Sequence, residues 1–267
     1  MVISIDNMDL RQIADSGQCF RWNMKEEGLC EIIAYNRKLR IRQQGNNFDL
    51  DCDRGEWEEI WSSYLDTDTD YRGIGRKIEE SGDDYLKSAY RYGSGIRILR
   101  QELWETLISF IISQNNNIKR IRGSIEAICS KAALPLRDGS KDGYRFPGPT
   151  DVDREFFNDK ELGLGYRDGY LADMFEYAAA HSGFEESLKQ MENEEAFLKL
   201  LSFKGIGRKV ANCVCLFGLH HIDAFPIDTH IKQILEKYYP HGFDLERYKG
   251  YAGIVQQYMF YYKIKNS

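Results

Sequence analysis

The sequence lacks the features of a membrane or secreted protein. None of its apolar runs approaches the length needed to cross a membrane, so we expect no transmembrane helix. The first residues, MVISIDNMDLRQ, lack the basic stretch and long apolar core of a secretory signal. We therefore expect an intracellular protein with no membrane partner, in the cytoplasm or nucleoid if it is prokaryotic and in the nucleus if it is eukaryotic.

Metal-ligand spacings are also missing. The six cysteines are scattered without a Cys-x2-Cys pair, and the five histidines show no metal-binding pattern. These absences weaken the case for structural zinc or an iron–sulfur cluster, and we expect neither a metal nor a cofactor. Because no export signal is present, we interpret the cysteines as reduced thiols.

The sequence has no overall positive charge, since its formal net charge is −6. That balance argues against nonspecific nucleic-acid binding by the chain as a whole. The charges are unevenly spread, however: residues 49–84 hold thirteen Asp and Glu against four Lys and Arg. Basic residues gather at RILR (97–100), KRIR (119–122) and KGIGRK (204–209), so a local basic face remains possible.

The first ninety or so residues read mainly as strands. RKLRIRQ alternates with Leu39 and Ile41 on one face, and NFDLDC alternates with Phe48 and Leu50. QGNN, between them, supplies turn residues. From about Ile96 the apolar period becomes helical. We expect helices at roughly 168–182, 194–202, 208–219, 229–238 and 245–262, with a Pro/Gly-rich loop at 134–150.

This pattern predicts an α+β fold. An antiparallel β-sheet domain (residues 1–95) would precede a larger all-helical domain (residues 96–267). One motif occurs nearly twice, as RGIGRK at 72–77 and KGIGRK at 204–209. Because acidic residues soon follow the first copy, we interpret that copy as a surface turn.

The second copy lies in FKGIGRKVANCVC (203–215). Gly205 and Gly207 can form a tight reversal between two helices while Ile206 enters the core. The helix that begins near Arg208 would offer free backbone N–H groups and a positive dipole end to a phosphate. The spacing is neither that of a Walker loop nor that of a dinucleotide fingerprint. On these residues alone, a plain helix–helix turn fits as well.

Lys209 and Asp228 add possible chemistry to this turn. Asp228 follows Pro226 and precedes an apolar-periodic helix, where an N-cap belongs. A capping carboxylate can also stabilise a developing cation or accept a proton. Lys209 at a helix N-terminus could form an imine with a sugar carbon, although a solvated surface lysine is the commoner case.

Together with this hairpin, four segments resemble the 8-oxoguanine DNA glycosylase/lyases of the helix-hairpin-helix-GPD superfamily. The segments are SGQCFRW (16–22), FIISQNNNIKRI (110–121), LGLGYRDGY (162–170) and YAGIVQQYMF (251–260). The resemblance implies that Lys209 attacks C1′ of the damaged nucleotide and forms a Schiff base. It also implies that Asp228 stabilises the oxocarbenium-like state and helps to orient the lysine.

The same resemblance implies a base pocket. Gly17 would offer its carbonyl to the N7 hydrogen, which 8-oxoguanine has and guanine lacks, and a site built on such a bond rejects the analogue without it. Gln256 would read the Watson–Crick edge of the flipped base, while Phe260 and Cys213 would lie on its two faces. Taken singly, each of these could instead be an ordinary turn or core residue.

Further residues would contact the DNA. By the resemblance, Asn115 fills the space left in the duplex, Tyr166 wedges the stack, and Arg120 and Arg167 contact the orphaned cytosine. His230 and the amides of the glycine hairpin would hold phosphates. Each again has a structural alternative, such as a core aromatic for Tyr166.

The function that we expect is excision of 8-oxoguanine opposite cytosine, followed by strand cleavage through β-elimination, in a monomer acting on double-stranded DNA. One alternative is a glycosylase for another damaged purine, against which Lys209 weighs because glycosylases that use water lack this lysine. The other is a noncatalytic hairpin module that only binds DNA. Such a module would explain the glycines but leave the Lys209–Asp228 pair unexplained.

Overall fold

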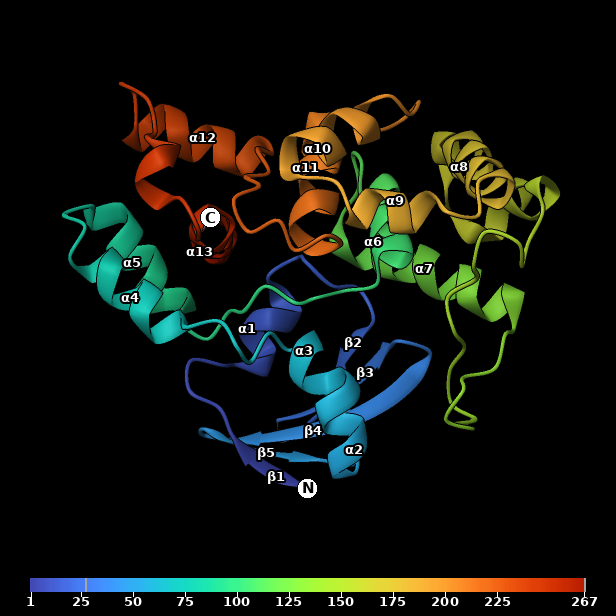
Figure 1. Ribbon diagram of the computed structural model, residues 1–267, viewed down its shortest axis with the longest axis horizontal. Helices are drawn as coiled ribbons and strands as arrows, with labels where there is room; N and C mark the ends of the chain where they lie inside the picture. Colours follow the sequence, from blue (N-terminus) through green and yellow to red (C-terminus); the bar gives the residue numbers. More distant parts are fainter. Residues whose placement is uncertain (27, 267) are drawn as a thin grey trace.

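The N-terminal part of the chain forms a five-stranded antiparallel sheet (Figure 1). The structure is a computed structural model that describes residues 1–26 and 28–266. The strand order is β1-β5-β4-β3-β2. The strands are β1 (Val2–Ser4), β2 (Trp22–Met24), β3 (Leu29–Ala34), β4 (Arg37–Gln44) and β5 (Asn47–Leu50).

The predicted alternation places one face of this sheet in a core. Leu39 and Ile41 are fully buried, whereas Arg40 between them is exposed. Ile41 pairs with Leu50 across the β4–β5 hairpin, whose turn includes Gly45 at φ +62°. The strands and the turn predicted for this region are therefore confirmed.

After β5 the chain is helical, so the expectation of strands up to about residue 90 was wrong. The helices are α2 (Arg54–Glu56), the π-helical turn η1 (Trp57–Trp61), α3 (Ser62–Tyr64), α4 (Tyr71–Glu79) and α5 (Asp84–Gly93). Asp53 starts the first of them by accepting a hydrogen bond from the backbone N–H of Glu56 at 2.8 Å. Trp61 and Tyr64, three residues apart, bury their rings in the core of the sheet.

The RGIGRK segment at 72–77 is likewise helical and not a surface turn. It lies inside α4, whose N-cap Asp70 accepts from the N–H of Gly73 at 2.8 Å. Ile74 and Ile78, four residues apart, both face the core. The capping aspartate and this apolar spacing outweigh the two glycines of the segment.

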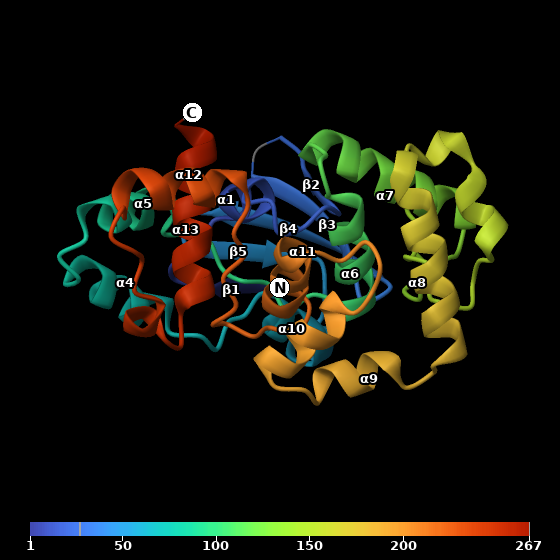
Figure 2. The same cartoon turned by 90° about the horizontal axis from the view of Figure 1, so that it is seen from above.

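The rest of the chain is a helical layer over the sheet (Figures 1 and 2). Its helices are α6 (Leu103–Ile112), α7 (Ile118–Ala132), α8 (Asp168–Ala180), α9 (Phe184–Lys189), α10 (Asn193–Leu201), α11 (Arg208–Phe217), α12 (Thr229–Tyr238) and α13 (Ala252–Lys265). Short 3-10 helices occur at η2 (Arg154–Asn158), η3 (Lys160–Leu162), η4 (Gly165–Arg167) and η5 (Leu245–Tyr248). The single helix expected at 245–262 is in fact η5 and α13, separated at Gly250, where φ is +87°.

Two helices from the first 95 residues, α4 and α5, pack in the helical layer. The ring of Tyr90 in α5 meets that of Tyr258 in α13 at 5.5 Å, and both helices contribute to the larger core. The division into domains at 95/96 stays a prediction. Within residues 1–26 and 28–266, no helix combines the length and apolar character that a membrane span requires.

Candidate active site

The glycine hairpin joins α10 to α11 as the sequence predicts. Gly205 has φ +86°, and a Cβ there would lie 2.4 Å from Cγ of Tyr170, so both backbone and space require glycine. Ile206 is buried. Gly207 is the N-cap residue of α11, in open space, and no side chain caps the helix. The first N–H groups of α11 are thus available to an anion.

Lys209, in the first turn of α11, is half-buried. Its Nζ donates a hydrogen bond to Oγ of Ser113 at 3.2 Å and lies 5.0 Å from the centre of the Phe110 ring. Both partners come from the C-terminal end of α6. By contrast, the neighbouring Arg208 is exposed and lies over Phe197. The contacts with Ser113 and Phe110 therefore hold the amine of Lys209 beside the C-terminal end of α6.

Asp228 caps α12, as predicted. Its Oδ1 accepts from the N–H of Ile231 at 2.8 Å, which fixes the carboxylate at the start of the helix. The Cys213 thiol lies within the electrostatic reach of both charged groups. Burial raises the pKa of Cys213, the charge of Lys209 and its hydrogen bond lower it, and the charge of Asp228 raises it. Both charges thus act on one thiol, and in the described part of the chain no ion pair of 4.0 Å or less joins Lys209 to Asp228.

Gly17 and Phe260 lie against each other. A Cβ on Gly17, where φ is +76°, would be 3.2 Å from Cε1 of Phe260 and 4.0 Å from Cδ1 of Ile118. The ring of Phe260 also meets the ring of His230 edge-on, at 5.8 Å between ring centres. The structure therefore brings together residues predicted for the base pocket and for phosphate binding from three distant segments.

Gln256, one turn before Phe260 on α13, is 3% exposed. Its Nε2 donates to the carbonyl of Pro226 at 3.0 Å, and its Oε1 accepts from Nε2 of Gln257 at 3.2 Å. Pro226 lies two residues before Asp228. The helix predicted to read the base is thus joined directly to the segment that carries the carboxylate.

The predicted wedge residues gather around the turn between α6 and α7. Asn115 is exposed, with φ +47°, a conformation that few residues other than asparagine and glycine adopt. Arg167 is 7% exposed and donates to the carbonyls of Gln114, Asn115 and Leu164. Tyr166 is 56% exposed and covers this guanidinium at 4.5 Å. Arg167 therefore holds the turn, and its donors do not project outward.

Arg120 and His230 occupy the first turns of their helices. The side chain of Arg120 is exposed, while its backbone N–H donates to the N-cap Asn117 at 3.0 Å. His230 is half-buried on α12, and among the described residues its Nδ1 has no hydrogen-bond partner. Both positions suit contact with an added polyanion.

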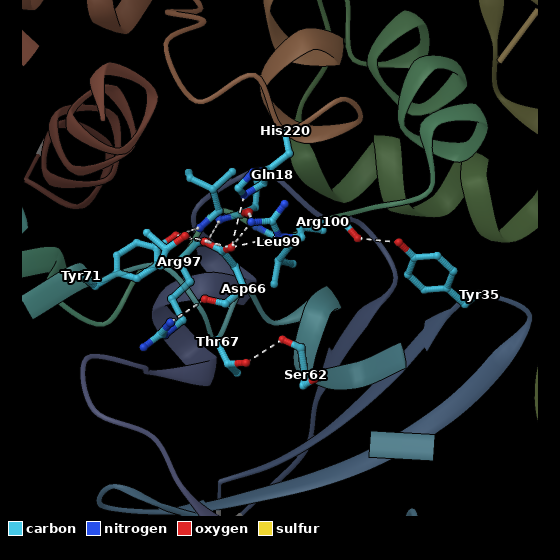
Figure 3. Close-up of polar contacts among 12 residues, drawn as sticks. Gln18, Tyr35, Ser62, Asp66, Thr67, Tyr71, Arg97, Leu99, Arg100 and His220 are labelled. Atoms are coloured by element: carbon cyan, nitrogen blue, oxygen red, sulfur yellow. Dashed lines mark hydrogen bonds and ion pairs between the residues drawn. The ribbon is translucent and has the colours of Figure 1, made fainter. Parts of the chain in front are cut away.

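Residues 96–101, which belong to neither a helix nor a strand, connect the loop of Gly17 and Gln18 to the rest of the site. Figure 3 shows Gln18 beside Arg97, Leu99 and Arg100. The side chain of Gln18 is completely buried; its Oε1 accepts from the N–H of Leu99 and its Nε2 donates to the carbonyl of Arg97, each at 2.9 Å. At the end of the segment, the N–H of Gln101 donates to the carbonyl of Phe217, the last residue of α11. Residues 96–101 therefore fix the position of the Gly17 loop relative to α11, the helix that carries Lys209.

Asp66 is the buried anion beside this segment (Figure 3). Its carboxylate accepts from Tyr71 Oη at 2.8 Å and Arg100 Nη2 at 2.9 Å, and Nε2 of His220 lies 3.5 Å away. Burial alone would raise the pKa of Asp66, but the contacts with His220, Tyr71 and Thr69 outweigh it and the pKa is lowered. Because His220 follows α11, this cluster also anchors the end of that helix.

Sequence reasoning missed several residues that position the site. Ser113 and Phe110 lie in a segment that the sequence analysis singled out, but nothing local indicates that they meet Lys209. Gln18 lies in the SGQCFRW segment, but nothing local indicates its partners, and Asp66 carried no signal beyond its polar character; each acts through partners far along the chain.

Several known proteins resemble this chain in sequence and in fold. The model of the 8-oxoguanine DNA glycosylase N-terminal domain matches residues 1–107. The N-glycosylase/DNA lyase of Saccharomyces cerevisiae is 28% identical over 270 residues, which cover 90% of this chain and 70% of that protein.

Two solved structures resemble the whole chain. MBOgg1, solved in complex with a low affinity DNA ligand, has a TM-score of 0.91 and 32% identity, covering 99% of this chain and 95% of its own. The Clostridium acetobutylicum 8-oxoguanine glycosylase/lyase, solved with double-stranded DNA containing cytosine opposite 8-oxoguanine, has a TM-score of 0.89 and 32% identity, covering 100% and 98%. The chain belongs to the 8-oxoguanine DNA glycosylase/lyase family.

Proposed function

We propose that this protein excises 8-oxoguanine from duplex DNA and then cleaves the strand at the resulting site. The observation that carries the proposal is the placement of Lys209, a half-buried amine held by Ser113 in the first turn of α11, together with the carboxylate of Asp228 fixed at the start of α12. A water-using glycosylase needs no such lysine. The family of the chain supports the same chemistry.

The first step is nucleophilic substitution at the sugar. The unprotonated amine of Lys209 forms a bond to C1′ as the C1′–N9 bond breaks, and the base leaves with the electron pair and takes up a proton. Positive charge develops on the sugar in the transition state, where the carboxylate of Asp228 stabilises it. Loss of a proton from nitrogen and opening of the sugar ring give the Schiff base.

The second step cleaves the strand. The Schiff base acidifies the C2′ hydrogens, so a base can remove one of them. The C3′–O bond then breaks and releases the 3′ phosphate, which completes a β-elimination. Hydrolysis of the remaining imine returns the amine of Lys209.

Base recognition is assigned to the Gly17–Phe260 region. Gly17 would accept a hydrogen bond from N7–H of 8-oxoguanine through its carbonyl, and Gln256 would contact the Watson–Crick edge. Phe260 and Cys213 would pack on the two faces of the ring. The contact between Gly17 and Phe260, and the hydrogen bond from Gln256 to the carbonyl of Pro226 near Asp228, support this assignment because a flipped base bound there would lie close to the proposed catalytic carboxylate.

Recognition of the opposite strand is assigned to the turn after α6. Asn115 would fill the gap left by the flipped base, Tyr166 would wedge the stack, and Arg120 would contact the cytosine. For Arg167 to touch the cytosine as well, its guanidinium would have to leave the carbonyls that it binds here. The N–H groups of the hairpin and His230 would hold phosphates, so affinity should fall steeply with salt.

A lesion panel tests this function. Duplexes carrying 8-oxoguanine, guanine or an alkylated purine, each opposite all four bases, are assayed separately for base release and strand cleavage. We expect release and cleavage to be fastest for 8-oxoguanine opposite cytosine. Preference for the alkylated purine would instead indicate a glycosylase for another lesion, and release of 8-oxoguanine without cleavage would contradict the second step. Binding without release would indicate a noncatalytic module.

A further inference from the structure

Two adjacent glutamines are buried in α13. Gln256 and Gln257 are each 3% exposed, and their helix neighbours Val255 and Tyr258 are fully buried. Glutamine is rarely buried in such surroundings unless its amide is hydrogen-bonded. The hydrogen bonds of the pair therefore indicate why both amides are there.

The amide of Gln256 is fixed in one orientation. Its Nε2 donates to the carbonyl of Pro226, which can only accept, and its Oε1 accepts from Gln257. An amide has two N–H groups and two oxygen lone pairs. Gln256 thus keeps one N–H group and one oxygen lone pair free for a base. Which end of the amide donates and which end accepts is fixed.

Gln257 has little structural reason to be a glutamine. Among the described residues its side chain makes one hydrogen bond, to Gln256, and its buried Oε1 has no partner. An unpaired buried oxygen destabilises a fold, and an apolar residue of the same size would avoid that cost. The remaining effect of Gln257 is on the amide of Gln256.

We infer that Gln257 is a positioning residue that favours 6-oxopurines over 6-aminopurines because its hydrogen bond adds to that of the Pro226 carbonyl in holding the amide of Gln256 in one orientation. The edge of a 6-oxopurine presents an acceptor at O6 and a donor at N1. A 6-aminopurine presents the reverse, a donor at N6 and an acceptor at N1. An amide free to rotate by half a turn can pair with either edge, whereas a fixed amide pairs with one. This inference rests on the proposed function.

The test uses two bases that differ at this edge and not at N7. Both 8-oxoguanine and 8-oxoadenine carry N7–H, so the predicted contact with Gly17 is common to both. We compare kcat/KM for base release from each, opposite the same cytosine, in the parent enzyme and in Gln257→Leu. Strand cleavage at a preformed abasic site, which offers no base, is measured in parallel.

In Gln257→Leu we expect the preference for 8-oxoguanine over 8-oxoadenine to fall by about three- to tenfold, the effect of one neutral hydrogen bond. Cleavage at the abasic site should stay within about twofold of the parent, and the melting temperature should be unchanged or higher. In a Gln256→Leu background, the second change should have no further effect on the preference. Gln190→Leu, at an exposed glutamine that ends α9, is the matched control.

An unchanged preference in Gln257→Leu would overturn the inference. So would an equal loss on all three substrates, because that result indicates general damage to the fold. A parent enzyme that releases neither 8-oxopurine would overturn the proposed function and, with it, this inference. That outcome appears in the parent alone and so differs from the other two.

Discussion

Nζ of Lys209 lies 3.2 Å from Oγ of Ser113, a residue almost one hundred positions earlier in the chain. Oγ of Ser113 in turn donates to the carbonyl of Phe110 at 2.8 Å, so its hydroxyl hydrogen is already used and its oxygen faces the amine as an acceptor. The end of α6 therefore orients the side chain that the proposed chemistry depends on.

Ser113→Ala should slow formation of the Schiff base. Loss of one hydrogen bond leaves Lys209 less well oriented, and we expect the single-turnover rate of base release to fall by about three- to tenfold. Ser202→Ala is the control. Ser202 also follows a helix, and its Oγ donates a hydrogen bond to the carbonyl of Lys199 in that helix. Among the described residues, no hydrogen bond joins its side chain to Lys209. Equal rates for the two variants would contradict the positioning role of Ser113.

Gly17→Ala should reduce the rate of base excision without destabilising the fold more than a glycine substitution at another positive-φ position does. Any side chain there meets a positive φ, which costs about 1 kcal/mol, and its Cβ would press on Phe260 at 3.2 Å. Gly45→Ala carries the same backbone strain, at φ +62°, with nothing within 4 Å. We expect similar losses of melting temperature in both variants, but a loss of 8-oxoguanine release only in Gly17→Ala. Release retained in Gly17→Ala would show that this position does not line the pocket.

Arg120→Ala and Arg167→Ala should have different effects. Arg120 is exposed, so its loss should leave the melting temperature unchanged while reducing the preference for cytosine as the opposite base. Arg167 is buried on three carbonyls, so its loss should destabilise the fold by about 2 kcal/mol or more and impair excision opposite every base. Thermal melts and excision rates opposite all four bases distinguish the two, and an unaltered preference in Arg120→Ala would refute its assignment.

Asp66→Asn should lower stability in a pH-dependent way. Asparagine tolerates the φ of +51° but brings no charge to His220 and Arg100. Because the folded-state pKa of Asp66 is lowered from its ordinary 3.8, ionised Asp66 stabilises the fold above that value, and this stabilisation is lost as pH falls through the folded-state pKa. We expect a difference of about 3 kcal/mol at pH 7 between parent and variant.

Urea denaturation at pH 7 and at several values below about 4 measures this difference. The difference in unfolding free energy between parent and Asp66→Asn should narrow as the pH falls. A gap that stays constant over the whole range would mean that the charge of Asp66 contributes nothing to the stability of the fold.

Local signals account for the parts of the fold that sequence analysis predicted. The alternation around Leu39 and Ile41, the glycine reversal at Gly205 and the cap at Asp228 each depend on residues within a few positions of one another. Such signals are strong because the backbone conformation itself requires those residue types. The helices between residues 54 and 93 were missed because short acidic stretches and glycines conceal their apolar spacing.

Tertiary contacts account for what could not be predicted. The partners of Lys209 come from α6, and the amide of Gln256 is set by its neighbour and by Pro226. The contact of Arg167 with the orphaned cytosine, which the family resemblance implies, stays a prediction, and nothing in the sequence indicates that this side chain is buried with its donors on backbone carbonyls. Which donor meets which acceptor across 30, 53 or 96 residues depends on how the helices pack.

Borohydride trapping tests the central claim, that Lys209 is the nucleophile. With duplex DNA carrying 8-oxoguanine opposite cytosine, the parent protein and Lys204→Gln, which alters an exposed lysine of the same hairpin, should both give a covalent protein–DNA adduct on reduction. Lys209→Gln should give none while still binding the duplex. An adduct of undiminished yield in Lys209→Gln would contradict the account.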